Sequence, residues 1–169
     1  IHIGRKKDWF PWVIDYFKKI NPYLFKHFEE IMNPTGLENY LTNQGIKYAV
    51  ILAEYSPKVT GTVTNEFVYE FCKGHKRFIP FASINPSSTS QPEMILEKCV
   101  KDMNFQGLKL YPTYQHFFPN HKNLYPLYEK IVELKIPVMF HTGSSIYKNS
   151  KLKYGDPLYL DDLATDFPE

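Results

Sequence analysis

The stretch IKYAVILA at residues 46–53 is a nearly continuous run of apolar side chains that follows Gly45. Runs of this kind are typical of strands buried on both faces, as in parallel sheets. Three comparable runs follow along the chain: FIPFAS at 78–83, GLKLY at 107–111 and IPVMFH at 136–141. Their starts are 32, 29 and 29 residues apart, which is the length of a strand-helix-strand unit. The spacing therefore predicts an α/β protein with a parallel sheet.

Helical segments separate these strands. Thr64 is placed to cap one helix, and Pro92 stands in the first turn of the next. Residues 124–134 repeat the apolar spacing of a helix, and a last short helix is expected at 156–163. Such alternation indicates either a closed eight-stranded barrel or an open doubly wound sheet. No glycine-rich phosphate loop follows the first strands, which disfavours the open nucleotide-binding sheet.

Residues 8–32 do not follow this period. They predict two aromatic-rich helices broken at Asn21-Pro22, inserted after an opening strand at 1–4. The insertion is either a helix pair of the core or a cap over the site. A complete barrel takes about 250 residues, so this chain has room for about five strands. We therefore expect 1–169 to be the amino-terminal part of a single (β/α)₈ TIM barrel domain, with about the first five β/α units.

Composition excludes several classes of protein. Twenty basic and eighteen acidic residues leave a net charge of +2 without a basic cluster, which argues against a nucleic-acid or anionic-membrane partner. The apolar runs are strand-sized, too short to span a bilayer. Cys72 and Cys99 fall in helical segments and indicate buried, reduced thiols, typical of a cytoplasmic protein. The 17% aromatic content suits an aromatic-lined pocket for a small-molecule substrate.

Functional side chains of parallel α/β folds lie at the carboxyl ends of strands. This rule selects residues that end or nearly end the expected strands: His2, Glu54, Asn85, Tyr111 and His141. His2 and His141 can share a divalent cation such as zinc, although a lone histidine at a strand end is more often an ordinary hydrogen-bonded structural residue. By position alone, four residues are candidate substrate contacts: Glu54, Asn85, Tyr111 and Tyr114.

Three motifs in this order resemble the amidohydrolase-related (amidohydrolase 2) family: GLKLYP at 107–112, LYPLYE at 124–129 and PVMFHTG at 137–143. The terminal stretch at 156–168 is similar to the lead-in to the sixth strand of that family. The resemblance covers the chain from about Leu37 onward. It implies an eight-fold barrel that holds a divalent metal, usually zinc, and performs hydrolysis or non-oxidative decarboxylation.

The resemblance also implies a metal site. His2 matches the second histidine of the family's opening His-x-His, and His141 matches the histidine of strand five. The first histidine would precede Ile1, whereas a further histidine and an aspartate would follow Glu169, as would the catalytic acid-base residue. Because a catalytic zinc takes three protein ligands, we expect residues 1–169 to bind metal weakly and to show no metal-dependent hydrolysis, and an extended chain to be active.

Lys109 and the remaining histidines have competing interpretations. In some metal-dependent barrels a strand-four lysine is carboxylated; for Lys109 we favour an interior lysine paired with a carboxylate, its amine pKa lowered by burial. His116 and His121 lie in the loop on the side of the site. His27 lies in the insertion, and His75 lies at the opposite end of the strands, where residues support stability.

The function that this resemblance implies is metal-dependent hydrolysis. Metal lowers the pKa of bound water, so that hydroxide attacks a carbonyl carbon of a small substrate. One alternative is a non-oxidative decarboxylase that uses the same metal. Another is a non-catalytic half-barrel scaffold, whose open sheet edges would promote a homo-oligomer.

Overall fold

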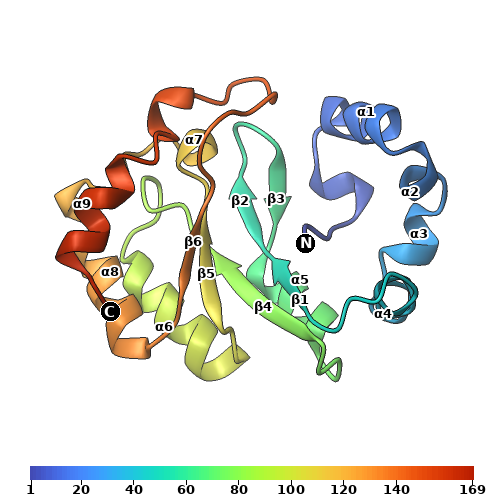
Figure 1. Cartoon of the computed structure of the whole chain (residues 1–169), viewed down its shortest axis with the longest axis horizontal. Coiled ribbons are helices and arrows are strands. Elements are labelled where there is room, and N and C mark those ends of the chain that lie inside the picture. Colours follow the sequence, from blue (N-terminus) through green and yellow to red (C-terminus); the bar gives the residue numbers. More distant parts are fainter.

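Four parallel strands form the sheet of this protein, whose 169 residues are all described by a computed structural model (Figure 1). The strands are β1 (Ala49–Leu52), β4 (Phe78–Ser83), β5 (Gly107–Leu110) and β6 (Val138–Phe140). They pair in the order β1-β4-β5-β6, so neighbours in the sheet follow one another along the chain. Each strand lies within an apolar run that predicted it, and Figure 1 shows the four strands side by side in one sheet.

The opening strand expected at 1–4 is shorter than predicted. It consists of one parallel bridge between His2 and Leu52. The backbone nitrogen of Ile1 donates to the Val50 oxygen at 2.5 Å, and the Leu52 nitrogen donates to the Ile1 oxygen at 2.9 Å. The chain then leaves the sheet and enters a short 3₁₀ helix, η1 (Lys6–Asp8), which prevents further pairing.

Helices cover the sheet and bury its apolar side chains. The structure has α5 (Asn65–Cys72), α6 (Pro92–Met103), α8 (Tyr125–Leu134) and α9 (Tyr159–Asp166). Figure 1 shows α6, α8 and α9 on one side of the sheet, and Leu108 and Leu110 belong to the core cluster that these helices share. The Thr64 cap is confirmed, since its hydroxyl accepts from the Phe67 nitrogen at 3.1 Å. None of these helices combines the length and apolar character needed to cross a membrane.

The last helix begins later than expected. α9 starts at Tyr159 rather than at Asp156 and extends to Asp166. The Asp156 carboxylate accepts a hydrogen bond from the Leu158 nitrogen at 3.0 Å. This bond forms a turn ahead of the helix, because Asp side chains compete with helical hydrogen bonding in this way.

The insertion at 8–32 contains three helices instead of the two predicted: α1 (Pro11–Ile20), α2 (Pro22–Lys26) and α3 (Phe28–Ile31). The predicted break at Asn21 is confirmed, because its side chain accepts from the Leu24 nitrogen at 3.0 Å and starts the next helix. A second break, at His27, was not expected. The helix α4 (Pro34–Asn43) follows and leads toward β1.

A β-hairpin that the sequence did not predict follows β1 directly. It pairs β2 (Glu54–Ser56) with β3 (Gly61–Val63). The insertion docks on it, since the Phe10 nitrogen donates to the Thr60 oxygen at 3.0 Å. A Cβ atom on Gly61 would lie 2.1 Å from the Asp8 oxygen, so this contact requires glycine. The hairpin therefore brings the insertion over the carboxyl ends of the strands.

The first prediction concerns Gly107, which faces the ring of Phe81 across the β4–β5 ladder. A Cβ atom on Gly107 would lie 2.4 Å from that ring. We expect Gly107→Ala to lower the free energy of unfolding by about 2 kcal/mol through overpacking, measured by urea denaturation. Adding Phe81→Leu should restore part of the loss. Gly45→Ala is the control: nothing lies within 4 Å of its Cβ, so it costs only about 1 kcal/mol of backbone strain. Equal losses would contradict the packing argument.

Candidate active site

A small cavity of about 60 Å³ lies at the carboxyl ends of the strands. Every candidate site residue except Asn85 lines it. The lining residues are His2, Trp9, Val13, Phe17, Glu54, Thr60, Tyr111, Tyr114, His141 and Tyr147. Asn85 lies instead in a separate depression beside Ser83 and Thr64. The rule that functional residues lie at strand ends placed Asn85 at the correct edge of the sheet, but it could not predict which cavity at that edge Asn85 lines.

His141 is held at the end of β6 as a continuation of the ladder. Its backbone nitrogen donates to the Leu110 oxygen at 2.9 Å. Its Nε2 atom is buried and has no hydrogen-bond partner. Burial, reinforced by the nearby charge of Lys109, lowers the pKa of His141. The neutral imidazole is thereby favoured, and this is the form that binds metals.

His2 lies in the same cavity, next to a buried carboxylate. Its Nδ1 atom is 3.6 Å from Oε2 of Glu54, and its ring centroid is 6.0 Å from that of Tyr111. The Glu54 side chain is buried, while that of His2 is 46% exposed. The hydroxyl of Thr60 donates to the other carboxylate oxygen of Glu54. The two candidate metal ligands thus differ in exposure: the imidazole of His2 is accessible to solvent, whereas Nε2 of His141 is buried.

Lys109 places a buried positive charge beside the cavity. Its ammonium nitrogen lies 5.0 Å from the centroid of the Tyr111 ring and takes part in none of the salt bridges of the structure. Burial lowers the pKa of Lys109 to about 8, against an opposing influence of Glu54. The expected pairing of Lys109 with a carboxylate is therefore wrong, because Lys109 forms no salt bridge. Glu54 influences the pKa of Lys109 only from a longer distance.

Gln115 is a buried amide that connects three strand ends, at the last position of α7 (Pro112–Gln115). Its Oε1 accepts from the Tyr111 nitrogen at 3.0 Å, and its Nε2 donates to the oxygens of Tyr55 at 3.0 Å and Ile84 at 3.1 Å. The Tyr111 hydroxyl in turn donates to the Ala53 oxygen at 3.0 Å. The sequence gave no sign of Gln115, because its partners are backbone atoms of distant segments.

Aromatic side chains from two distant segments close the cavity. Trp9, Val13 and Phe17 come from the insertion, and Tyr147 comes from the loop after β6. The ring of Tyr147 lies 5.9 Å from that of Tyr114. The insertion therefore covers the site and also fills core, since Trp9 and Val13 belong to the core cluster. Val13 and Phe17, four residues apart, lie on one face of α1, a signal that could have identified them, whereas Trp9 precedes the helix in an extended segment that bridges to Gly61.

The other histidines do not line this cavity: His27, His75, His116 and His121. His75 Nδ1 lies 3.0 Å from a Glu38 carboxylate oxygen, and His116 Nε2 lies 2.9 Å from the Asn149 backbone oxygen. These contacts give both histidines a structural role.

The two cysteines are free thiols. Burial raises the pKa of Cys72 to about 12 and that of Cys99 to about 11. Thiols with raised pKa values are poor nucleophiles and poor metal ligands at neutral pH. The expected burial holds for Cys99, whereas Cys72 is only partly buried.

The site fits part of a divalent metal centre. The unpartnered Nε2 of His141 is a donor suited to a metal, and Nε2 of His2 also makes no hydrogen bond. No three His, Cys, Asp or Glu side chains come together as a group that could hold an ion. Because a catalytic zinc uses three protein ligands, this chain supplies an incomplete set.

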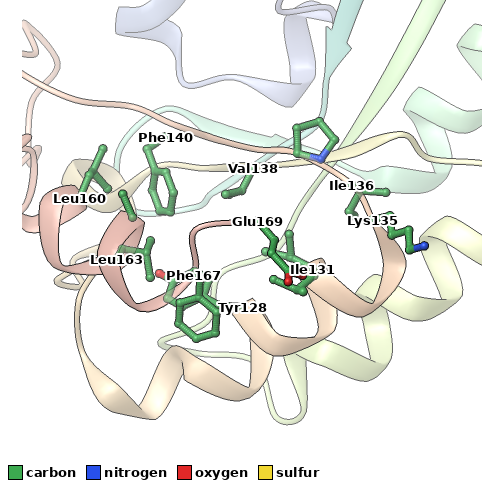
Figure 2. Close-up of a pocket in the computed structure, with 13 residues that line it drawn as sticks. Tyr128, Ile131, Lys135, Ile136, Val138, Phe140, Leu160, Leu163, Phe167 and Glu169 are labelled. Carbon is green, nitrogen blue, oxygen red and sulfur yellow. The ribbon is translucent and has the colours of Figure 1, made fainter.

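A larger cavity lies elsewhere and has a different character. It measures about 660 Å³ and lies between α8, β6 and α9, with side chains such as Ile131, Phe140 and Leu163 around it (Figure 2). Its charged lining residues are Lys135 and Glu169. This groove flanks β6, which pairs only with β5. Because the groove has no imidazole that could ligate a metal, it is a less suitable metal-dependent catalytic site than the smaller cavity.

A curved parallel sheet with histidines at its strand ends defines a barrel protein with a candidate metal site. A family model described as amidohydrolase matches residues 35–169. The chain belongs to the amidohydrolase family. None of the curated proteins matches it.

Solved structures confirm the barrel fold. An uncharacterized TIM-barrel protein from Bordetella bronchiseptica aligns with a TM-score of 0.72 at 22% identity, covering 94% of this chain and 56% of that one. The 5-carboxyvanillate decarboxylase of Novosphingobium aromaticivorans, solved with bound manganese, aligns with a TM-score of 0.61 at 13% identity, covering 96% and 53%. The 2,6-dihydroxybenzoate decarboxylase from Rhizobium gives 0.60 at 15% identity, covering 88% and 51%. This chain thus spans about half the length of these structures.

The second prediction concerns the amide of Gln115. Gln115→Leu removes the side-chain partner of the buried Tyr111 nitrogen, of the buried Ile84 oxygen and of the partly buried Tyr55 oxygen, so we expect a loss of about 3 kcal/mol in the free energy of unfolding. Gln106→Leu is the matched control, because that side chain is exposed. Urea denaturation measures both variants. A loss no larger than that of the control would contradict the structural role of the amide.

The third prediction concerns the charge of Lys109. Its pKa is about 8 in the folded state against 10.5 for a free lysine, so its charge opposes folding most strongly below pH 8. Lys109→Met should therefore raise the free energy of unfolding near pH 7 by about 2 kcal/mol. The gain should shrink as pH rises from about 8 to 10.5, where the folded-state amine is neutral. Denaturation at several pH values tests this, with exposed Lys98→Met as control; a pH-independent difference would refute it.

Proposed function

We propose that this chain forms one half of the active site of a metal-dependent hydrolase, in which metal-activated water attacks a carbonyl carbon of a small substrate. The observation that carries the proposal is the buried, unpartnered Nε2 of His141 in a cavity shared with His2. Both residues lie at strand ends, where barrel enzymes have their active sites. The proposal assigns the remaining metal ligands and the acid-base residue to polypeptide outside residues 1–169.

His2 and His141 would hold the metal in this proposal. When bound, a divalent metal lowers the pKa of a water ligand and polarises a carbonyl oxygen. Imidazole suits zinc, which is our first choice, and the related decarboxylase structure contains manganese. Zinc and manganese are therefore both to be tested.

The other cavity residues would bind and orient the substrate. Tyr114 and Tyr147 form a wall with their ring centroids 5.9 Å apart, and Trp9 and Phe17 add two more aromatic rings to the lining. Walls of this kind exclude water and accept flat, apolar groups. The ammonium of Lys109, which has no salt-bridge partner, supplies a positive charge for an anionic group of the substrate.

The aromatic wall and the buried ammonium of Lys109 also favour a second candidate function, the non-oxidative decarboxylation of a small aromatic acid. An aromatic wall suits the ring of such a substrate, and a buried cation suits its carboxylate. Two of the similar structures are decarboxylases, named for 5-carboxyvanillate and 2,6-dihydroxybenzoate. Both candidate reactions use the same metal site and differ in the bond that breaks.

The fourth prediction tests the metal site. Titration of the purified protein with Zn²⁺ or Mn²⁺, followed by calorimetry, should show binding that His141→Ala weakens at least about tenfold, because few ligands hold the ion. His75→Ala is the control, since this histidine pairs with Glu38 far from the cavity. Binding that survives the loss of His141 would exclude this site. Absence of binding in the whole protein would favour the non-catalytic scaffold.

Activity assays separate the two reactions. The metal-loaded whole protein would be incubated with amides, lactones and carboxylated phenols, and both ester or amide cleavage and CO₂ release would be followed. Cleavage without CO₂ release supports hydrolysis. CO₂ release from a carboxylated phenol supports the second candidate and contradicts the first.

A further inference from the structure

The Glu54 carboxylate is buried, and both of its oxygens face other groups of the protein. Glu54 is 5% exposed. The Thr60 hydroxyl donates to Oε1, and Oε2 lies 3.6 Å from Nδ1 of His2. Burying a carboxylate is costly unless its oxygens have partners. One oxygen of Glu54 is therefore hydrogen-bonded and the other faces His2, an arrangement better suited to orienting His2 than to contacting a substrate.

The imidazole of His2 presents its two nitrogens to different surroundings. Nδ1 faces the carboxylate at a distance slightly too long for a hydrogen bond, as is common for such contacts before a ligand binds. Nε2 makes no hydrogen bond. A neutral imidazole carries one proton, and a facing carboxylate favours its position on Nδ1. That tautomer leaves the lone pair of Nε2 free.

The hairpin explains why the carboxylate stays in place. Glu54 begins β2 and pairs with Val63 of β3, and the turn between these strands brings Thr60 back to it. The turn is held by the Thr60 nitrogen, which donates to the Ser56 oxygen at 3.1 Å. The insertion holds the same residue through the bond from Phe10 to the Thr60 oxygen. Hydrogen bonds to its backbone nitrogen and to its backbone oxygen therefore both hold Thr60 in place.

We propose that Glu54, held by Thr60, is a positioning residue that fixes His2 as the Nδ1-protonated tautomer and so leaves Nε2 free to bind a divalent metal. This assignment differs from a substrate contact for Glu54. Its second half rests on the proposed function, because it concerns the metal. Its first half, the tautomer of His2, holds for the metal-free protein.

Neutralisation of Lys109 is a competing explanation for a carboxylate at this position. Glu54 raises the pKa of Lys109 against the effect of burial, so the two charges interact. They form no salt bridge, however, whereas His2 lies within 4 Å of the carboxylate. The Lys109→Met variant distinguishes the two roles: positioning predicts that the His2 tautomer stays unchanged when the lysine charge is removed.

Long-range ¹H–¹⁵N correlation NMR on the metal-free protein reads the tautomer directly. At a pH where His2 is neutral, we expect the Nδ1-protonated pattern to dominate. Glu54→Gln and Thr60→Val should shift it toward the Nε2-protonated form, while Glu54→Asp should retain part of the original preference. His75 reports on the fold in the same spectrum. An unchanged His2 pattern in Glu54→Gln, or one that changes in Lys109→Met, would overturn the inference.

Metal binding provides the second measurement. We expect Glu54→Gln to weaken Mn²⁺ affinity by about 10-fold to 100-fold, while Glu129→Gln, on the exposed face of α8, changes it less than about twofold. Equal affinities in the Glu54 variant and in wild type would overturn the metal half of the inference. If wild type binds no metal, the proposed function fails, and the NMR result alone decides whether Glu54 positions His2.

Discussion

Parallel pairing of the strands in chain order determines where the functional side chains of this protein can lie. Each strand is followed by a segment that returns the chain to the same starting edge, so all carboxyl ends meet at the other edge. Glu54, Tyr111 and His141 converge there, although they are far apart in sequence. The side chain of Gln115 then bonds to segments that follow three different strands. The site is therefore as rigid as the sheet that carries it.

Two charged side chains that a purely structural core would avoid are buried here: Glu54 lines the cavity, and Lys109 lies beside it. Glu54 has a hydroxyl and an imidazole as neighbours, and Lys109 has only an aromatic ring close by. Burying charged groups without close pairing reduces stability. Proteins retain such destabilising groups mainly at functional sites, where charges already fixed in place stabilise a ligand or transition state when it forms. The rest of the core is apolar and compensates for this loss.

The strands and the edge that carries the site could be predicted from sequence, because strands buried on both faces leave apolar runs such as 78–83. The rule of strand ends also selected His2 and His141, which the structure places in the lining of one cavity. It could not separate neighbouring cavities, and so it misplaced Asn85. The β2–β3 hairpin was missed because strands of three residues have no detectable periodicity. Contacts such as Thr60 with Glu54 depend on that hairpin and were therefore beyond the reach of sequence.

The chain-order arrangement of the sheet also has a consequence for biosynthesis. Strands that begin at residues 49, 78, 107 and 138 can join the sheet one at a time as the chain leaves the ribosome, because each new strand meets the edge left by its predecessor. Contacts over such short separations form early. At the stage when β6 and α9 have joined, the exposed surface includes the free edge of β6 and the apolar groove beside it (Figure 2). A nascent chain at that stage exposes an unpaired strand edge, with which a strand of another chain can pair incorrectly. Its folding is therefore most sensitive to contacts with other chains at this stage.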